Sequence, residues 1–181
     1  MKIAIFSSWS HTISDSNKQL AQDIGRYFAE KNITAVTGGC SGIPAIVIES
    51  THQHNGKTIG YFPVRDHGHY TDSQHLENIH DIQFYSQANF VEGFTARSLQ
   101  MIKNVDAAIV LNGRIGTLSE FGIAVEEGLP LGIIEGTGGI TDELKTIVRV
   151  AQKEFPSNEV IFGDEYKKVI DMLIENYHAK K

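Results

Sequence analysis

The segment NGRIGTLSE, residues 112–120, joins an apolar run to an amphipathic one. The run before it, Ala107–Leu111, is typical of a strand that is buried on both faces. Gly113 and Gly116 allow the backbone to turn sharply after this strand, and the residues that follow begin a predicted helix. Backbone N–H groups in such a turn can point at an anion, and α/β proteins bind phosphate there. The segment therefore predicts a strand, a phosphate-binding turn and a helix in succession.

Similar short apolar runs recur along the chain, and the segments between most of them show the helical period. Examples of the helical pattern are Leu20, Ile24 and Phe28, the segment Leu144–Phe155, and the segment Tyr166–Tyr177. Strands that alternate with helices form parallel sheets through right-handed crossovers. We therefore predict an α/β fold, a doubly wound, Rossmann-like parallel sheet of about seven strands with helices on both faces. The predicted strands are Lys2–Phe6, Ile33–Val36, Thr58–Phe62, Ile82–Tyr85, Ala107–Leu111, Leu131–Ile134 and Val160–Phe162.

Length and composition favour one soluble domain. The 181 residues, of which 41% are hydrophobic, suit a single nucleotide-binding domain over residues 1–181. Neither a signal-peptide core nor an apolar run of about 18 residues is present, so we expect a cytoplasmic protein without a membrane partner. With Cys40 as the only cysteine, the chain can form no internal disulfide and no thiolate zinc cage.

The distribution of charge bears on the class of partner. The formal net charge is −6, and no cluster of Lys and Arg could follow a nucleic-acid backbone. We therefore expect no DNA or RNA duplex as a partner, and a small-molecule nucleotide instead. The irregular segment Pro63–His80 is rich in His, Asp and Gly, and loops of this length are often functional, so it could be a lid over the ligand.

Three glycine-containing loops follow predicted strands: Gly38–Gly42, Gly113–Gly116 and Gly136–Gly139. In a parallel sheet they come to one edge, which favours a phosphorylated ligand, although tight turns alone could also explain the glycines. The candidate phosphate- or nucleotide-binding residues are Gly38, Gly39, Ser41, Gly42, Gly113, Arg114, Gly116 and Thr117, and further ligand contacts could come from Ser8, Gly136, Thr137 and Gly138.

Other cofactors are disfavoured. None of these loops has the G-x-G-x-x-G fingerprint of a dinucleotide site, and Gly56-Lys57-Thr58 lacks the leading glycine of a P-loop. The histidine pairs His52/His54 and His67/His69 are separated by a predicted strand, so we predict no metal site. We assign Cys40 no chemistry, because no partner base can be identified.

Two charged residues near the central loop have alternative interpretations. Glu120 lies at the start of the predicted helix, where it could orient water or stabilise positive charge on a sugar ring. Thr117 and Glu120 also have the spacing of a capping box, which spacing alone favours. Arg97 interrupts the inner side of a predicted helix; it could bind phosphate or carboxylate, or it could be a snorkelling surface residue.

These residues together resemble the Lonely Guy (LOG) family, once labelled lysine decarboxylases. The family's hallmarks are a helical M-x-x-R-K and a following P-G-G-x-G-T-x-x-E, matched here by Arg97 and by the segment 112–120. The segment Thr37–Ile43 resembles the family's G-G-x-x-G-L-M turn. The resemblance extends over about residues 2–150 and is specific from Arg97 to Pro130. Asn112 stands in place of the proline, Arg114 in place of the second glycine and Ser98 in place of the lysine, as in a divergent branch of the superfamily.

The resemblance implies that Arg97 and Glu120 are catalytic. It implies a phosphoribohydrolase, which cleaves the N-glycosidic bond of a purine-type nucleoside 5′-monophosphate to free base and ribose 5-phosphate without a cofactor, and we favour this enzyme. The alternative is a non-catalytic carrier or sensor of a nucleotide or pterin (molybdenum) cofactor, since some members of the superfamily bind a pterin nucleotide without cleaving it. Scaffolding of an assembly is a third alternative. The resemblance also implies a homodimer or a higher homo-oligomer.

Overall fold

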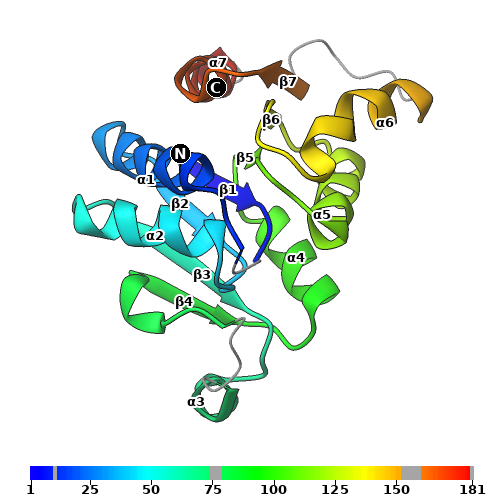
Figure 1. Cartoon of the computed structure of the whole chain (residues 1–181). Coiled ribbons are helices and arrows are strands. Elements are labelled where there is room, and N and C mark those ends of the chain that lie inside the picture. Colours follow the sequence, from blue (N-terminus) through cyan, green and yellow to red (C-terminus); the bar gives the residue numbers. More distant parts are fainter. Residues whose placement is uncertain (10–11, 74–78, 152–159, 180–181) are drawn as a thin grey trace.

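The computed structural model describes residues 1–9, 12–73, 79–151 and 160–179. Its centre is a seven-stranded sheet in the order β4-β3-β2-β1-β5-β6-β7, in which every neighbouring pair is parallel (Figure 1). The strands are β1 (Lys2–Phe6), β2 (Thr34–Thr37), β3 (Thr58–Phe62), β4 (Gln87–Phe90), β5 (Ala107–Val110), β6 (Leu131–Ile134) and β7 (Val160–Gly163). The predicted α/β class and parallel sheet are confirmed.

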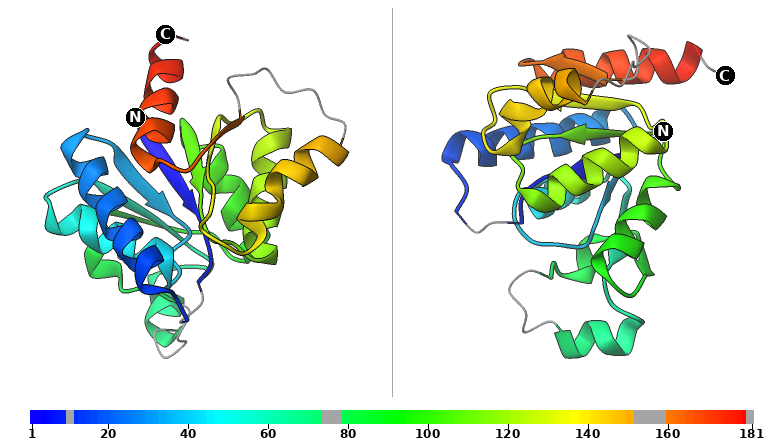
Figure 2. Two further views of the ribbon diagram at one scale, coloured as in Figure 1. Left: turned by 45° about the horizontal axis from the view of Figure 1, so that its top comes forward. Right: turned by 90° about the vertical axis from the view of Figure 1, so that its right-hand side faces the viewer.

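Helices cover both faces of the sheet, as predicted. The α-helices are α1 (Asp15–Glu30), α2 (Ile43–Gln53), α3 (His67–Ser73), α4 (Phe94–Ile102), α5 (Ile115–Glu126), α6 (Leu144–Val150) and α7 (Tyr166–Ala179). Figures 1 and 2 show α1 and α2 on one side of the sheet and α4, α5 and α6 on the other. Two 3₁₀ turns, η1 (Ile82–Phe84) and η2 (Ile140–Glu143), complete the described elements. No helix among the described residues is long and apolar enough to cross a bilayer.

The central strands are buried on both faces because neighbouring residues face opposite helix layers. In β1, Ile3 and Ile5 pack in the cluster that includes residues of α1, α2 and α7, whereas Ala4 and Phe6 pack in the cluster beneath α4, α5 and α6. All four side chains are at most 2% exposed. The apolar runs of the sequence therefore reflect a sheet between two helix layers.

One predicted strand is wrong. Residues 82–85 do not form a strand: η1 occupies Ile82–Phe84, and the edge strand β4 begins at Gln87. Asp81 caps the 3₁₀ turn, because its side chain accepts a hydrogen bond from the backbone N–H of Gln83. β4 is only partly buried, so its sequence lacks the continuous apolar character of the central strands.

The segment 63–80 is less irregular than the sequence suggested, since α3 occupies part of it. Residues 74–78 lie outside the described residues, as does the predicted helical position Phe155. α6 ends at Val150.

The strand order places a topological switch point at the centre of the sheet. From β1 the chain moves outward through β2 and β3 to β4, and it then returns to the other side of β1 as β5. The loops after β1 and β5 therefore diverge, and α/β proteins bind ligands in the crevice beyond the carboxyl ends of such strands. The motif that begins at Asn112 follows β5 at this place.

Candidate functional site

Asn112 joins the loops that follow β1, β5 and β6. Its carbonyl oxygen accepts hydrogen bonds from the backbone N–H of Ser8 and the hydroxyl of Ser7, both at 2.9 Å. Its own backbone N–H donates to Thr137 Oγ1 at 2.9 Å, and its side-chain amide donates to the Thr137 carbonyl at 2.9 Å. The backbone of Asn112 has φ +35°. Proline has a fixed negative φ and no backbone N–H. It could therefore neither adopt the backbone conformation of Asn112 nor donate the hydrogen bond to Thr137.

A cavity of about 650 Å³ opens at the switch point. Its walls come from the loop after β1, the turn after β2 and the first turns of α4 and α5. Seven of the predicted site residues border it: Ser8, Gly38, Arg97, Arg114, Gly116, Thr117 and Glu120. Arg114 therefore leaves room for a ligand.

Arg97 and Glu120 form an ion pair in this cavity. Arg97 Nη1 lies 3.4 Å from Glu120 Oε1, and the two side chains are only 8% and 12% exposed. Ser98, also on α4, donates its hydroxyl to the same carboxylate oxygen at 3.0 Å. The interpretation of Arg97 as a snorkelling surface residue is therefore wrong. Among the described residues, Arg97 Nε is buried and has no hydrogen-bond partner.

Gly38 makes room for this arginine. A Cβ atom at position 38 would lie 1.3 Å from Arg97 Nη1 and 2.3 Å from Arg97 Cζ, so only glycine permits the observed guanidinium position. The guanidinium carbon also lies 5.9 Å from the ring centroid of Phe94. The turn after β2 and the start of α4 thus hold Arg97 from two sides.

The electrostatics of the pair follow from its burial. Burial raises the pKa of the Glu120 carboxyl above its ordinary value, whereas Arg97 and the hydrogen bond from Ser98 act in the opposite direction. Burial likewise raises the pKa of the Cys40 thiol at the cavity wall, which favours the protonated and less reactive form. Glu120, with its raised pKa, is better suited than an exposed carboxylate to exchange a proton near neutral pH.

The predicted capping box is wrong. α5 begins at Ile115, earlier than Thr117, with Arg114 as the N-cap residue and no side-chain hydrogen bond at the cap. Thr117 is 2% exposed within the first turn, and Glu120 lies one turn further along the helix. The side chain of Arg114 therefore makes no capping hydrogen bond to the first backbone N–H groups of α5, and such a helix start beside the cavity suits an anion.

The glycine loop after β6 does not border the cavity, unlike the glycine loops after β2 and β5. Gly139 forms a parallel bridge with Gly113, so this loop lies beside the loop after β5. The backbone N–H groups of Gly136 and Gly138, however, donate to Asp142 Oδ1 at 3.2 and 3.3 Å. Gly113, Gly136, Thr137 and Gly138 are absent from the cavity wall. In this structure Thr137 binds Asn112, and the two glycine amides are bound by a carboxylate of the protein itself.

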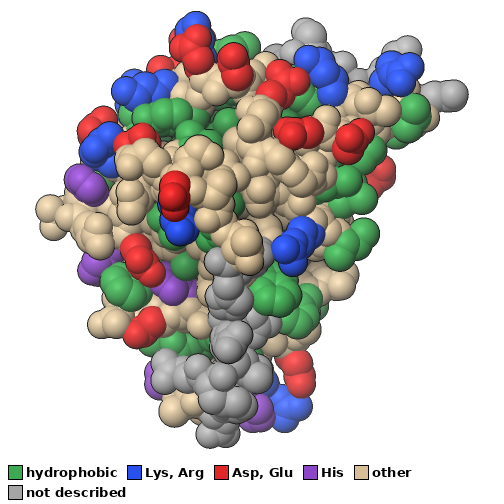
Figure 3. Space-filling model, in the orientation of Figure 1, with side chains coloured by type: hydrophobic (Ala, Val, Ile, Leu, Met, Phe, Trp, Pro, Cys, Tyr) green, Lys and Arg blue, Asp and Glu red, His purple; other side chains and the backbone are tan. Residues whose placement is uncertain are grey.

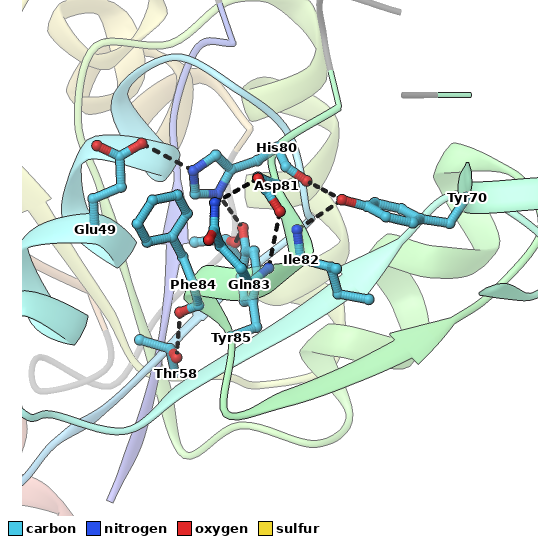
Figure 4. Close-up of polar contacts among 10 residues, drawn as sticks. Glu49, Thr58, Tyr70, His80, Asp81, Ile82, Gln83, Phe84 and Tyr85 are labelled. Atoms are coloured by element: carbon cyan, nitrogen blue, oxygen red, sulfur yellow. Dashed lines mark hydrogen bonds and ion pairs between the residues drawn. The ribbon is translucent and has the colours of Figure 1, made fainter. Parts of the chain in front are cut away.

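His80 contacts the turn after β2 through its backbone, and Figure 4 shows the polar contacts of its side chain with Glu49 and Tyr85. The backbone N–H of His80 donates to the carbonyl oxygen of Gly39 at 3.0 Å. The two ring nitrogens of His80 lie 3.0 Å from the Tyr85 hydroxyl and 3.0 Å from Glu49 Oε1. The ring of Phe84 stacks on the imidazole with 5.3 Å between centroids. His80 is 7% exposed, so a buried polar network supports this side of the site.

The remaining glycines of this turn serve close packing. Gly39 has φ +66° and faces the ring of Phe62, and Gly42 has φ +84° and lies against the backbone of Ser8 and Trp9. Ser41 lies between them in the same turn but is absent from the cavity wall. Only Gly38 and Cys40 of this turn border the cavity.

Sequence reasoning missed the roles of Ser98, Asn112 and His80. Ser98 and Asn112 were visible only as departures from the family motif, and nothing in the sequence pairs His80 with Glu49. No group of three or more His, Cys, Asp or Glu side chains suited to a metal ion occurs among the described residues. On the face in Figure 3, Lys and Arg side chains are scattered among acidic ones rather than gathered in a stripe.

The fold and the site define an α/β protein with a cavity at the switch point of a parallel sheet. The model of the SLOG cluster4 family matches residues 1–170, and the chain belongs to this family. The predicted place as a divergent member of the superfamily is thus confirmed. No curated protein matches the sequence.

Three solved structures show the same fold. The molybdenum cofactor binding protein from Rippkaea orientalis is 20% identical over 97% of this chain and 95% of its own, with a TM-score of 0.72. The molybdenum cofactor carrier protein from Chlamydomonas reinhardtii is 17% identical over 98% of both chains, with a TM-score of 0.75. DNA processing protein A from Helicobacter pylori, described with a single-stranded DNA binding mode, is 19% identical over 98% of this chain and 82% of its own, with a TM-score of 0.63.

Proposed function

We propose that the protein is a phosphoribohydrolase, which hydrolyses the N-glycosidic bond of a nucleoside 5′-monophosphate to free base and ribose 5-phosphate. The observation that carries this proposal is the largely buried pair of Arg97 and Glu120 in a cavity beside the start of α5, where the N-cap residue makes no side-chain capping bond. The carboxyl group of Glu120, whose pKa is raised by burial, suits the chemistry at the glycosidic bond. The start of α5 suits the phosphate at the other end of the substrate.

The start of α5 binds the 5′-phosphate in this proposal. The backbone N–H groups of Gly116 and Thr117 donate to phosphate oxygens, and the positive end of the helix dipole favours the anion. Arg114 borders the cavity as the N-cap residue, where its guanidinium adds positive charge. The sugar then extends from α5 toward α4.

Glu120 and Arg97 act at the anomeric carbon. Glu120 accepts a proton from water as the water oxygen bonds to C1′, and the electrons of the C1′–N bond leave with the base. The departing base takes up a proton from solvent, and Glu120 releases its proton to solvent, which restores the carboxylate. Glu120 also stabilises the positive charge that develops on the ribose ring. Arg97 orients Glu120 through Nη1 and adds positive charge at the cavity wall.

Base release tests this proposal. Purified protein is incubated with AMP and with modified adenosine monophosphates, and free base is measured by chromatography. We expect base release by the wild type, loss of release in Glu120→Gln and strong reduction in Arg97→Ala. Glu126→Gln, at an exposed acidic residue of the same helix, is the matched control and should retain release. Stoichiometric binding without release from every substrate would contradict hydrolysis.

A second function is a carrier or sensor of a nucleotide or pterin cofactor. It is favoured by the engagement of Glu120 Oε1 with both Arg97 and Ser98, which suits a structural carboxylate, and by the two similar structures named for the molybdenum cofactor. Base release that Glu120→Gln abolishes would reject this second function.

The expected partner is a small nucleotide, with no DNA or RNA duplex, for a cytoplasmic protein that forms a homodimer or a higher homo-oligomer. The net charge of −6 and the mixed charge on the face in Figure 3 support the exclusion of a duplex. Titration with duplex DNA at low salt tests it, and sedimentation measures the oligomer.

A further inference from the structure

Three exposed apolar side chains surround the mouth of the cavity. Among the described residues, five large hydrophobic side chains are exposed, and Trp9, Phe94 and Ile115 border the cavity with 49%, 57% and 81% exposure. They come from the loop after β1, the start of α4 and the start of α5. Solvent exposure of such side chains is unfavourable, and their concentration at one opening indicates an apolar ligand group.

The backbone of Trp9 is held in place through its neighbour Ser8. The Ser8 carbonyl accepts a hydrogen bond from the backbone N–H of Ile43 at 3.3 Å, and the Ser8 N–H donates to Asn112. A Cβ at Gly42 would lie 2.6 Å from Trp9 Cα, so this glycine permits the close approach of the two segments. Trp9 is therefore held at the rim from the side of α2.

The rim and the floor of the cavity differ in chemistry. The floor carries the charged pair of Arg97 and Glu120. The rim is aromatic and aliphatic, with Arg114 near the start of α5. A ligand that fits both is amphipathic: an anionic and hydroxylated part for the floor and helix start, and a flat, weakly polar part for the rim.

We propose that Trp9 and Phe94 form the specificity subsite for the heteroaromatic ring of the bound nucleotide. This inference rests on the proposed function and adds that the ring, rather than the sugar phosphate alone, determines which ligand binds. Trp9 and Phe94 provide faces for stacking, and Ile115 closes the edge of the subsite. The ligand class is therefore a monophosphate that carries a planar heteroaromatic base.

The chain supplies its own reporter, because Trp9 is its only tryptophan. AMP and ribose 5-phosphate share the phosphate and the sugar, and only AMP has a heteroaromatic ring. We expect AMP to change the emission of Trp9, and ribose 5-phosphate to compete with AMP without changing the emission. Calorimetry uses the Glu120→Gln background, which should not hydrolyse AMP. In that background, Trp9→Ala should bind AMP about 10-fold to 100-fold more weakly than the protein with Trp9, and ribose 5-phosphate within about twofold. Trp9→Phe should recover most of the AMP affinity.

Met172→Ala is the matched control, since Met172 is 47% exposed on α7 and is absent from the cavity wall. It should bind both ligands as the wild type does. Equal weakening of AMP and ribose 5-phosphate in Trp9→Ala, or no weakening of AMP, would overturn the subsite while leaving the proposed function intact. Failure of both ligands to bind the wild type would overturn both. Trp9 emission that changes with protein concentration instead of with AMP would assign the rim to a second copy of the chain and refute the subsite.

Discussion

Gly38→Ala tests how the site is built, because the predicted damage comes from one methyl group. Position 38 has no left-handed φ, so its backbone accepts alanine. The new Cβ would lie 1.3 Å from Arg97 Nη1, whereas non-bonded atoms rest about 3.5 Å or more apart. The guanidinium must therefore move by about 2 Å, and the open side is the cavity.

The magnitude follows from the loss of the ion pair. Arg97 Nη1 and Glu120 Oε1 are already 3.4 Å apart, so this movement breaks the contact. A hydrogen bond to a charged group contributes about 1.5–3 kcal/mol, which bounds the loss of stability. Misplacement of a positioning group by about 1 Å can cost about 100-fold in rate, so kcat/KM should fall at least about 100-fold, equivalent to about 2.7 kcal/mol.

The assay combines urea unfolding with base release from AMP. Gly122→Ala is the control: nothing lies within 4 Å of its Cβ position in α5, and it should be stabilised by about 0.5–1 kcal/mol with unchanged activity. In the Arg97→Ala background, Gly38→Ala should cost little further stability, because the clash is gone. Equal destabilisation in both backgrounds, or full activity of Gly38→Ala alone, would refute the reasoning.

Three further predictions concern Asn112, Glu120 and His80. Asn112→Pro should lose at least about 3 kcal/mol in urea unfolding, because proline cannot adopt φ +35° or donate to Thr137, whereas Asn112→Gly should lose less; equal losses would contradict this. The raised pKa of Glu120 means that its contribution to stability is full below the ordinary value of 4.5 and is lost as pH rises through the folded pKa. Wild type should therefore lose unfolding free energy relative to Glu120→Gln above pH 4.5, and parallel pH profiles would oppose this sign. His80→Phe should lower the free energy of unfolding by about 1–3 kcal/mol, because Glu49 and the Tyr85 hydroxyl lose this partner, and it should weaken AMP binding. An unchanged free energy of unfolding would show that the His80 network does not stabilise the fold.

The central part of the fold was predictable because buried parallel strands have an unambiguous signal. Ala107–Val110 and Leu131–Ile134 are fully apolar apart from one glycine, and both form strands. β4 was misplaced because an edge strand needs no apolar face, so the apolar residues Ile82 and Phe84 were more conspicuous than Gln87–Phe90. The apolar runs of the sequence thus identified the buried strands but not the partly buried edge strand β4.

The candidate site was predictable in its residue types but not in its contacts. The motif around Arg97 and Glu120 identified two residues that the structure brings together. The burial of Arg97 depends on a missing side chain at Gly38, far away in the sequence, and no local pattern encodes that relation. The capping box failed because the helix start lies earlier than Thr117, and spacing alone does not fix a helix boundary.

The most direct measurement of the central claim is a crystal structure of Glu120→Gln with AMP. The account predicts the 5′-phosphate at the backbone N–H groups of Gly116 and Thr117, the ribose C1′ beside the side chain at position 120, and the adenine ring against Trp9. A nucleotide bound away from the start of α5, or a cavity that remains empty at saturating AMP, would contradict it.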